Sequence, residues 1–245
     1  KWPDYFFRGS WMIRGSNNNY IDDKYYNGNI IPKDESNLYS YFNLDDTDIR
    51  DNDNVYTFSS SGISFTQVIT RDSRNHPEFP TSGSRSIWTS TLSGSFLGGN
   101  QDYHKHLLDF SWFTPIHKKF TISQIFKMGV LEKIDEKDGQ ISIIPPSVQF
   151  IMGGTGIPYG EMLRGYTENR VGPSSQRGNV MMKYSLEFRL SLSENPTIYA
   201  LSFFEMGNVW SELDVTDPFD LKRSSGVGIR VFIPMLGMLG YDIGY

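Results

Sequence analysis

A run of strict alternation between apolar and polar side chains constrains this sequence more than any other feature. Every second position from 180 to 192 is apolar, and most positions between them are polar or charged; the apolar set is Val180, Met182, Tyr184, Leu186, Phe188, Leu190 and Leu192, and the polar set is Lys183, Ser185, Glu187, Arg189 and Ser191, with Met181 as the exception. Side chains of a strand point alternately to opposite faces, so the run predicts a strand with one apolar and one charged face. Its length exceeds that of an ordinary globular strand and reaches the ~9–11 residues of a tilted membrane strand.

Weaker versions of the same pattern recur, whereas helical patterning is nearly absent. They bring the predicted total to about nine strands, and the other segments are residues 5–14, 55–70, 84–97, 104–114, 119–130, 197–210, 222–233 and 239–245. The connections alternate in length. Short or medium turns cover 72–83, 115–118, 194–196 and 234–237, and the opposite side carries 15–54, 98–103, 131–179 and 211–221, with a short strand expected near 147–152.

Short turns at one rim and long loops at the other are typical of an outer-membrane barrel. The alternative is a soluble β-sandwich with uneven loops. A sandwich core is apolar, but here the face opposite the apolar positions is polar, and that favours the barrel. We therefore predict an all-β chain that forms part of an antiparallel transmembrane β-barrel.

Composition excludes several classes of function. The 245 residues include 23 Lys plus Arg and 28 Asp plus Glu, so the formal net charge is 23 − 28 = −5. Binders of nucleic acid are usually basic, so no nucleic-acid partner is expected. The absence of cysteine excludes disulfides, thiolate metal sites and cysteine nucleophiles. No run approaches the ~18 consecutive apolar residues of a transmembrane helix.

Signs of enzymatic or metal chemistry are weak. His104 and His106 form a His-x-His pair, but two ligands without a third favour ordinary rim or loop histidines. The acidic stretch 45–53 lacks the glycine and glutamate positions of a calcium loop, which favours a solvated surface loop. Neither a phosphate-binding loop nor a serine nucleophile elbow is present. We expect no catalytic residue, no metal and no cofactor, and hence no enzyme.

The candidate functional site is the loop over 152–173, whose centre reads Arg164-Gly165-Tyr166. A charge that enters a barrel interior must be paired or solvated. Glu187 lies on the polar face of its predicted strand and is one candidate partner. Glu205 lies in the strand 197–210, where the alternation leaves its direction open. A solvated loop arginine is the other interpretation of Arg164.

Four stretches in order resemble one known family. They are the turn at 79–85, the loop from Gly153-Gly154 through Arg164-Gly165-Tyr166 to Gly172-Pro173, the strand segment Ser185-Leu186-Glu187-Phe188, and the segment 203–210. Across residues 54–245 the chain resembles the C-terminal barrel of the BamA family of outer-membrane protein assembly factors, within the bacterial surface antigen superfamily. The resemblance maps its strands to the seventh through fifteenth of a sixteen-stranded barrel. The family's N-terminal periplasmic domains and final strand have no counterpart here, so residues 1–245 are expected to be a partial barrel domain, with 15–54 as a variable surface loop.

The resemblance also implies a role for the loop. In the family it folds back into the lumen, which carries over as a latch from Arg164 to Glu205, with Glu187 as a second partner. The family usually has aspartate at the position of Glu205. Gly165 would allow a tight turn, Tyr166 would pack on the inner wall, and Gly153 and Gly154 belong to the same loop.

The implied function is to fold and insert β-barrel proteins into the Gram-negative outer membrane as part of the BAM complex. The implied partners are the outer-membrane lipid bilayer, unfolded β-barrel client proteins and accessory assembly lipoproteins. Sister transporters of the superfamily, either a translocation and assembly module barrel or a two-partner secretion pore, share the Arg-Gly-aromatic loop and stay open as alternatives. A passive porin is the third.

Overall fold

The chain folds into one large antiparallel sheet. In a computed structural model, which describes residues 5–42, 44, 45, 47–134, 142–174 and 176–245, the long strands follow one another in chain order. They are β1 (Phe7–Asp23), β5 (Val55–Asp72), β6 (Gly83–Ser93), β7 (Tyr103–His117), β8 (Phe120–Lys133), β9 (Val180–Glu194), β10 (Thr197–Trp210), β11 (Lys222–Ile233) and β12 (Gly237–Gly244), and a short β4 (Arg50–Asp51) pairs with β5. The prediction of an all-β antiparallel fold with about nine long strands is confirmed.

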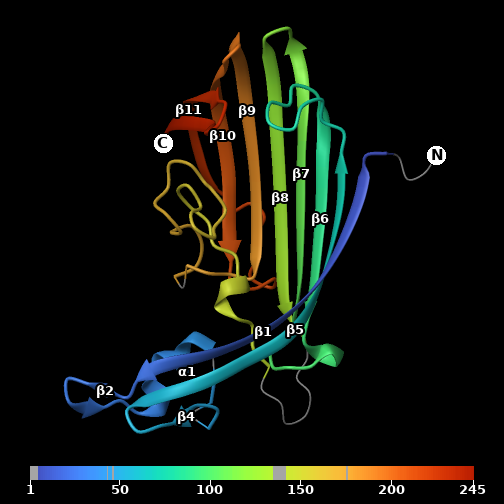
Figure 1. Cartoon of the computed structure of the whole chain (residues 1–245). Helices are drawn as coiled ribbons and strands as arrows, with labels where there is room; N and C mark the ends of the chain where they lie inside the picture. The colour runs from blue at the N-terminus through green and yellow to red at the C-terminus, as the bar shows by residue number, and fades with distance from the viewer. Residues whose placement is uncertain (1–4, 43, 46, 135–141, 175) are drawn as a thin grey trace.

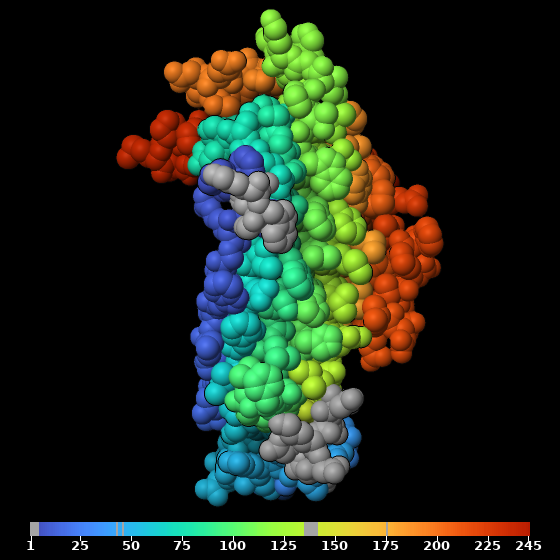
Figure 2. Space-filling model, turned by 90° about the vertical axis from the view of Figure 1, so that its right-hand side faces the viewer, coloured from blue at the N-terminus to red at the C-terminus, as the bar shows by residue number. Residues whose placement is uncertain are grey.

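The sheet curves into a wall with a different kind of connection at each rim (Figure 1). β7 and β8, β9 and β10, and β11 and β12 join through tight turns, whereas long segments link β1 to β5, β8 to β9 and β10 to β11. Figure 2 shows the neighbouring strands β1, β5, β6, β7 and β8 lying side by side, with the colours passing in chain order from blue to green. No helix among the described residues is long and apolar enough to cross a membrane.

In β9 polar side chains are buried and apolar ones are exposed, which is the reverse of a strand in a soluble protein. Its polar residues Lys183, Ser185 and Glu187 are buried, at 4%, 2% and 6% exposure. On the opposite face Phe188 and Leu192 are 50% and 53% exposed. Alternation fixes which residues share a face, and the apolar set faces outward, as a lipid-facing wall requires.

The segment 15–54, predicted as one long polar loop, is ordered structure, so that prediction was wrong in part. β1 continues to Asp23 and, together with β5, extends past the other strands (Figure 1). Beyond them lie a hairpin of β2 (Tyr25–Tyr26) and β3 (Asn29–Ile30), a 3-10 turn η1 (Lys33–Glu35) and helix α1 (Asn37–Phe42). They enclose a second apolar core, made of Leu38, Phe42, Leu44, Ile49, Tyr56, Phe58 and Ile143. We call this region, formed by β2, β3, η1 and α1, the cap. Its apolar residues are scattered among polar ones and do not alternate, so a period of two did not reveal it.

The long connection between β8 and β9 also differs from expectation. No strand forms at 147–152; a 3-10 turn, η3 (Pro146–Val148), is followed by isolated bridges at Phe150 and Met152. Another 3-10 turn, η2 (Ser95–Leu97), ends the predicted segment 84–97 after β6. The main apolar core lies between this connection and the inner wall, and it contains Tyr103, Leu131, Phe150, Met152, Leu163, Val171, Met181 and Val209.

Candidate functional site: a loop latched inside the barrel wall

The loop between β8 and β9 is folded back on itself before it meets the wall. Met152 bridges both Glu161 and Val171, and Gly154 bridges Leu163. Leu163 and Met152 are fully buried in the core that the loop shares with the wall. This packing places the next residue, Arg164, against β9 and β10, beside which the loop lies in Figure 1.

Arg164 is the centre of the site. Its Nη2 donates to Glu205 Oε1 at 2.8 Å and to Glu187 Oε1 at 2.7 Å. Its backbone N–H also donates to Glu205 Oε2 at 2.9 Å. The arginine is 6% exposed and Glu205 1%, so these are charge-assisted bonds away from bulk water. The structure thus brings together the three residues that the sequence singled out, and it resolves the direction of Glu205, which points inward.

The other loop residues that the sequence singled out shape the backbone around Arg164 or anchor it to the wall. Gly165 has φ +86°, a left-handed conformation that disfavours any side chain, and a Cβ there would approach the backbone of Tyr245 to 3.1 Å. Tyr166 packs beside the main core, and its hydroxyl donates to the Arg223 carbonyl at 2.9 Å. Gly153 and Gly154 also have positive φ, of 132° and 56°, at the base of the loop.

A wider ion network surrounds Arg164, and sequence reasoning missed most of it. Lys183 lies 3.6 Å from Glu205 and 3.3 Å from Glu161, and Lys127 joins Glu161 at 3.0 Å to Asp109 at 3.7 Å. On the other side Arg189 holds Glu187 at 2.7 Å. Five cations (Lys127, Arg164, Lys183, Arg189 and Arg230) therefore meet five carboxylates (Asp109, Glu161, Glu187, Glu205 and Asp242) in one connected, neutral set.

Asp242 on β12 reaches the same centre. Arg230 of β11 donates two hydrogen bonds of 2.7 Å to the Asp242 carboxylate, and Arg164 Nη1 lies 3.6 Å from that carboxylate. Phe203 covers the remaining side of Arg164, whose guanidinium carbon sits 3.7 Å from the ring centre. Glycines on the inner faces of β11 and β12 leave room for this contact; a Cβ on Gly244 would meet both the Gly165 backbone and the Phe203 ring at 3.1 Å.

Some of these residues carried a signal in the sequence. Lys183 and Arg189 stand on the polar side of the clearest alternation, and Asp242 alternates with Leu239, Tyr241 and Ile243. A rule that pairs inward charges of opposite sign would have found them. Glu161 carried no signal, because its position depends on how an irregular loop folds.

The site holds the loop in place, and its groups are engaged with one another. Among the described residues there is no group of three or more His, Cys, Asp or Glu side chains placed to bind a metal. His104 and His106 are strand residues of β7, and His104 Nε2 lies 3.3 Å from Glu132. In the acidic stretch 45–53, Asp46 lies outside the described residues, and Asp48 accepts the backbone N–H of Asp45.

An antiparallel wall with an open apolar face, a buried charged face and a loop latched to that charged face defines an outer-membrane β-barrel protein. The chain belongs to the Omp85 superfamily, whose domain matches residues 12–245.

Two proteins named BamA are similar to this chain. The chain is 25% identical over 183 residues to the outer membrane protein assembly factor BamA of Nitratidesulfovibrio vulgaris, a match covering 72% of this chain and 22% of that protein. In three dimensions it resembles the crystal structure of BamA from Haemophilus ducreyi lacking POTRA domains 1–3, with a TM-score of 0.65, 18% identity, and coverage of 80% of this chain and 41% of that one. The chain therefore spans less than half of either relative, and the match is to a BamA-like barrel portion in the outer membrane.

Proposed function

We propose that this chain is the barrel portion of an assembly factor that folds and inserts β-barrel proteins into the Gram-negative outer membrane. The observation that carries the proposal is the latched loop. Arg164 holds it against the inner wall through Glu205 and Glu187, so a fixed element occupies the space beside β8 to β10. The similarity to two proteins named BamA supports the same choice within the superfamily.

The proposed activity needs no bond chemistry, no cofactor and no metal. Backbone N–H and C=O groups cannot stay unpaired in lipid, so a client strand needs a protein edge to pair with while it enters the membrane. The proposed partners are the outer-membrane bilayer, unfolded β-barrel clients and accessory assembly lipoproteins of a BAM-type complex, with no role for nucleic acid.

The test is a reconstituted insertion assay with the full-length protein in liposomes. A urea-unfolded outer-membrane barrel is added, and its folded fraction is followed by heat-dependent gel mobility and protease protection. We expect folding to be faster than in empty liposomes. Equal rates with and without the protein, in the presence of its accessory lipoproteins, would contradict the proposal.

A sister transporter of the superfamily is the second candidate, because its loop would carry the same Arg-Gly-aromatic centre. The same liposomes distinguish it. A transporter would move an added passenger protein into the vesicle interior without inserting it in the bilayer. A passive porin would instead give large, steady conductance in a planar bilayer, whereas the latched loop predicts small or fluctuating currents.

A further inference from the structure

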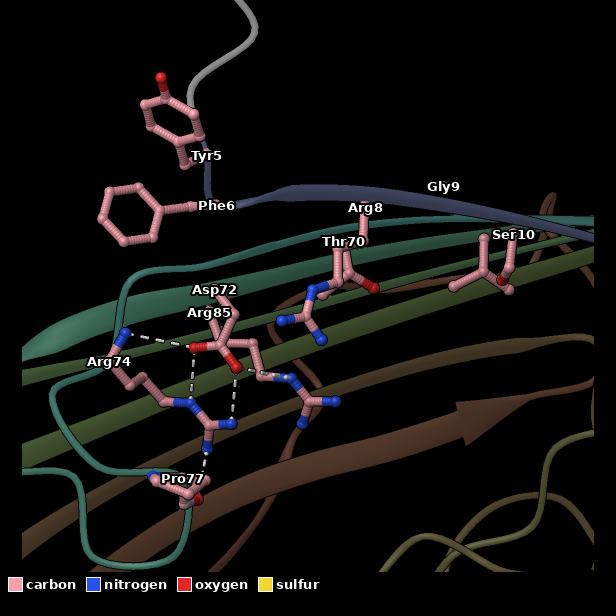
Figure 3. A pocket seen from close by; sticks show the side chains of 11 residues that line it. Tyr5, Phe6, Arg8, Gly9, Ser10, Thr70, Asp72, Arg74, Pro77 and Arg85 are labelled. Atoms are coloured by element: carbon pink, nitrogen blue, oxygen red, sulfur yellow. Dashed lines mark hydrogen bonds and ion pairs between the residues drawn. The ribbon is translucent and has the colours of Figure 1, made fainter.

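A second charged cluster lies on the same face of the sheet, far along it from the latch. It lines a pocket of about 690 Å³ between β1, the end of β5, the start of β6 and the turn that joins β5 to β6 (Figure 3). Arg8 faces Thr70 across the β1–β5 pair, and Asp72 faces Arg85 across the β5–β6 pair. Residues directly opposite in neighbouring strands share a face. The line of opposite residues that starts at Arg85 runs through Ser111, Ile125 and Ser185 to Glu205. The pocket therefore opens on the lumen side.

The pocket carries an excess of positive charge. Among the described residues that line it, Arg8, Arg74 and Arg85 stand with a single carboxylate, Asp72, so their formal charge is 3 − 1 = +2. Arg74 uses that carboxylate fully, with Nε at 2.9 Å and Nη2 at 2.8 Å, and its Nη1 donates to the Pro77 carbonyl at 2.9 Å. These bonds fix the turn, and they leave the other two guanidiniums without an equal partner.

Arg85 and Arg8 have guanidinium N–H donors that are available to a ligand. Arg85 Nε lies 4.0 Å from Asp72, beyond hydrogen-bond distance, and this buried nitrogen has no hydrogen-bond partner in the part of the chain that the structure describes. Arg8 is exposed, and no hydrogen bond or ion pair joins its guanidinium to another described residue. Figure 3 shows both guanidiniums directed into the same pocket, with Tyr5 and Phe6 beside its mouth.

The geometry points to an oxyanion site in this pocket, for a phosphate or a carboxylate carrying one or two negative charges. Guanidinium groups present paired N–H donors that match the oxygens of these anions. The ligand would bridge Arg8 and Arg85, while Arg74 keeps Asp72 and holds the turn. The site is separate from the loop latch and does not depend on the proposed assembly activity.

The experiment is isothermal titration of the purified full-length protein, in maltoside micelles and chloride buffer, with inorganic phosphate and separately with acetate. We expect saturable binding of at least one anion, and phosphate alone or acetate alone would identify the ligand class. The R8Q/R85Q double variant should bind about tenfold more weakly or worse, since each ~1.4 kcal/mol is a factor of ten. Arg14→Gln is the matched control, because it removes one charge from the same face of β1 outside this pocket.

Asp72→Asn gives a change of opposite sign. It removes the competing carboxylate, so anion binding should become tighter, and a purely structural role for the cluster would not produce that result. Heat-dependent gel mobility checks that each variant keeps its barrel. The site is refuted if neither anion saturates the parental protein, if R8Q/R85Q binds as well as the parent, or if Arg14→Gln weakens binding as much as the double variant.

Discussion

The two halves of the inner wall handle charge in opposite ways. Around the loop, five cations and five carboxylates form a connected set, and Arg164 at its centre is 6% exposed. Away from the loop, the same face of β1, β5 and β6 carries Arg8, Arg14 and Arg85 with Asp72 as the nearby carboxylate, and both Arg8 and Arg14 are exposed. The other carboxylate on this face, Asp22, lies in the extension of β1 and accepts hydrogen bonds from Asn37. One sheet thus has a neutral ion network in its covered half and a basic cluster in its open half.

The difference shows that the loop, by excluding water, determines whether a charge on the wall needs a partner. Where the loop excludes water, an unpaired charge would cost several kcal/mol, and every charged group of the network around Arg164 has a partner of opposite sign. Lys105, which the same connection covers, instead donates to the Val148 carbonyl. Where the lumen stays open, water solvates the arginines and no partner is required. Charges in the covered half should therefore be sensitive to substitution, whereas charges in the open half should tolerate it.

The largest effect is expected for Arg164→Ala. It leaves Glu187 and Glu205 buried without their shared cation, and removing one partner of a buried pair costs about 3–5 kcal/mol. The loop should undock, its protease sensitivity should rise, and insertion of client barrels should fall at least about tenfold. Limited proteolysis of the loop and the liposome folding assay measure the two results.

Arg170→Ala is the matched control, since Arg170 is an exposed arginine of the same loop. It should leave both measurements close to the parental values. Parental assembly rates and an unmoved loop in Arg164→Ala would remove the basis for the latch.

The next effect separates the two carboxylates. Glu205 accepts the side chain and the backbone N–H of Arg164 and also the Ser185 hydroxyl at 3.1 Å, whereas Glu187 shares its charge between Arg164 and the less buried Arg189. Glu205→Gln should therefore lower the free energy of loop docking by about 2–3 kcal/mol, and Glu187→Gln by about 1–2 kcal/mol. Urea dependence of loop proteolysis ranks them. A larger loss in Glu187→Gln would contradict the assignment of Glu205 as the main acceptor.

Glu161→Gln tests whether the covered half has a second anchor. Glu161 joins the loop to Lys127 at 3.0 Å and Lys183 at 3.3 Å, but it is only half-buried. Lys183 would keep Glu205, so we expect a smaller loss of about 1 kcal/mol in the same measurement. Combining Glu161→Gln with Glu205→Gln should cost more than the sum of the two, because Lys183 then loses both carboxylates.

The sequence predicted the regular strands better than the irregular segments that pack against them. The approximate strand number and the polar inner face of β9 followed from a period of two, because alternation fixes which side chains share a face. The resemblance added the pairing of Arg164 with Glu205 and Glu187. The positions of Glu161 and of the cap around α1 were not predictable, because they depend on irregular backbone and on contacts between residues far apart in sequence.

A smaller effect belongs to the base of the loop, where pH acts on an exposed group. Thr155 and Gly156 donate their backbone N–H groups to Glu168, and the Thr155 hydroxyl donates at 2.6 Å. These bonds, led by that hydroxyl, lower the pKa of Glu168 from its ordinary 4.5. The stability that ionised Glu168 adds to the loop is therefore fully present above pH 4.5 and is lost as the pH falls through the lowered pKa. Proteolysis near Thr155 by an acid-active protease should therefore rise at low pH, relative to neutral pH, more in the parent than in Glu168→Gln; identical pH profiles would exclude this link.

The smallest effect is expected in the open half, and it tests the comparison directly. Arg14→Gln removes a guanidinium from the same inner face, but Arg14 is exposed, and no hydrogen bond or ion pair joins its guanidinium to another described residue. Because water solvates it in the folded chain, its loss should change the free energy of unfolding by no more than about 0.5 kcal/mol. Arg164→Gln is the paired variant, with the same chemical change under the loop, and should cost several times more. Urea unfolding of both variants in the same vesicles gives the ratio. A cost for Arg14→Gln close to that of Arg164→Gln would mean that the open half is also covered, and that solvent access does not distinguish the two regions.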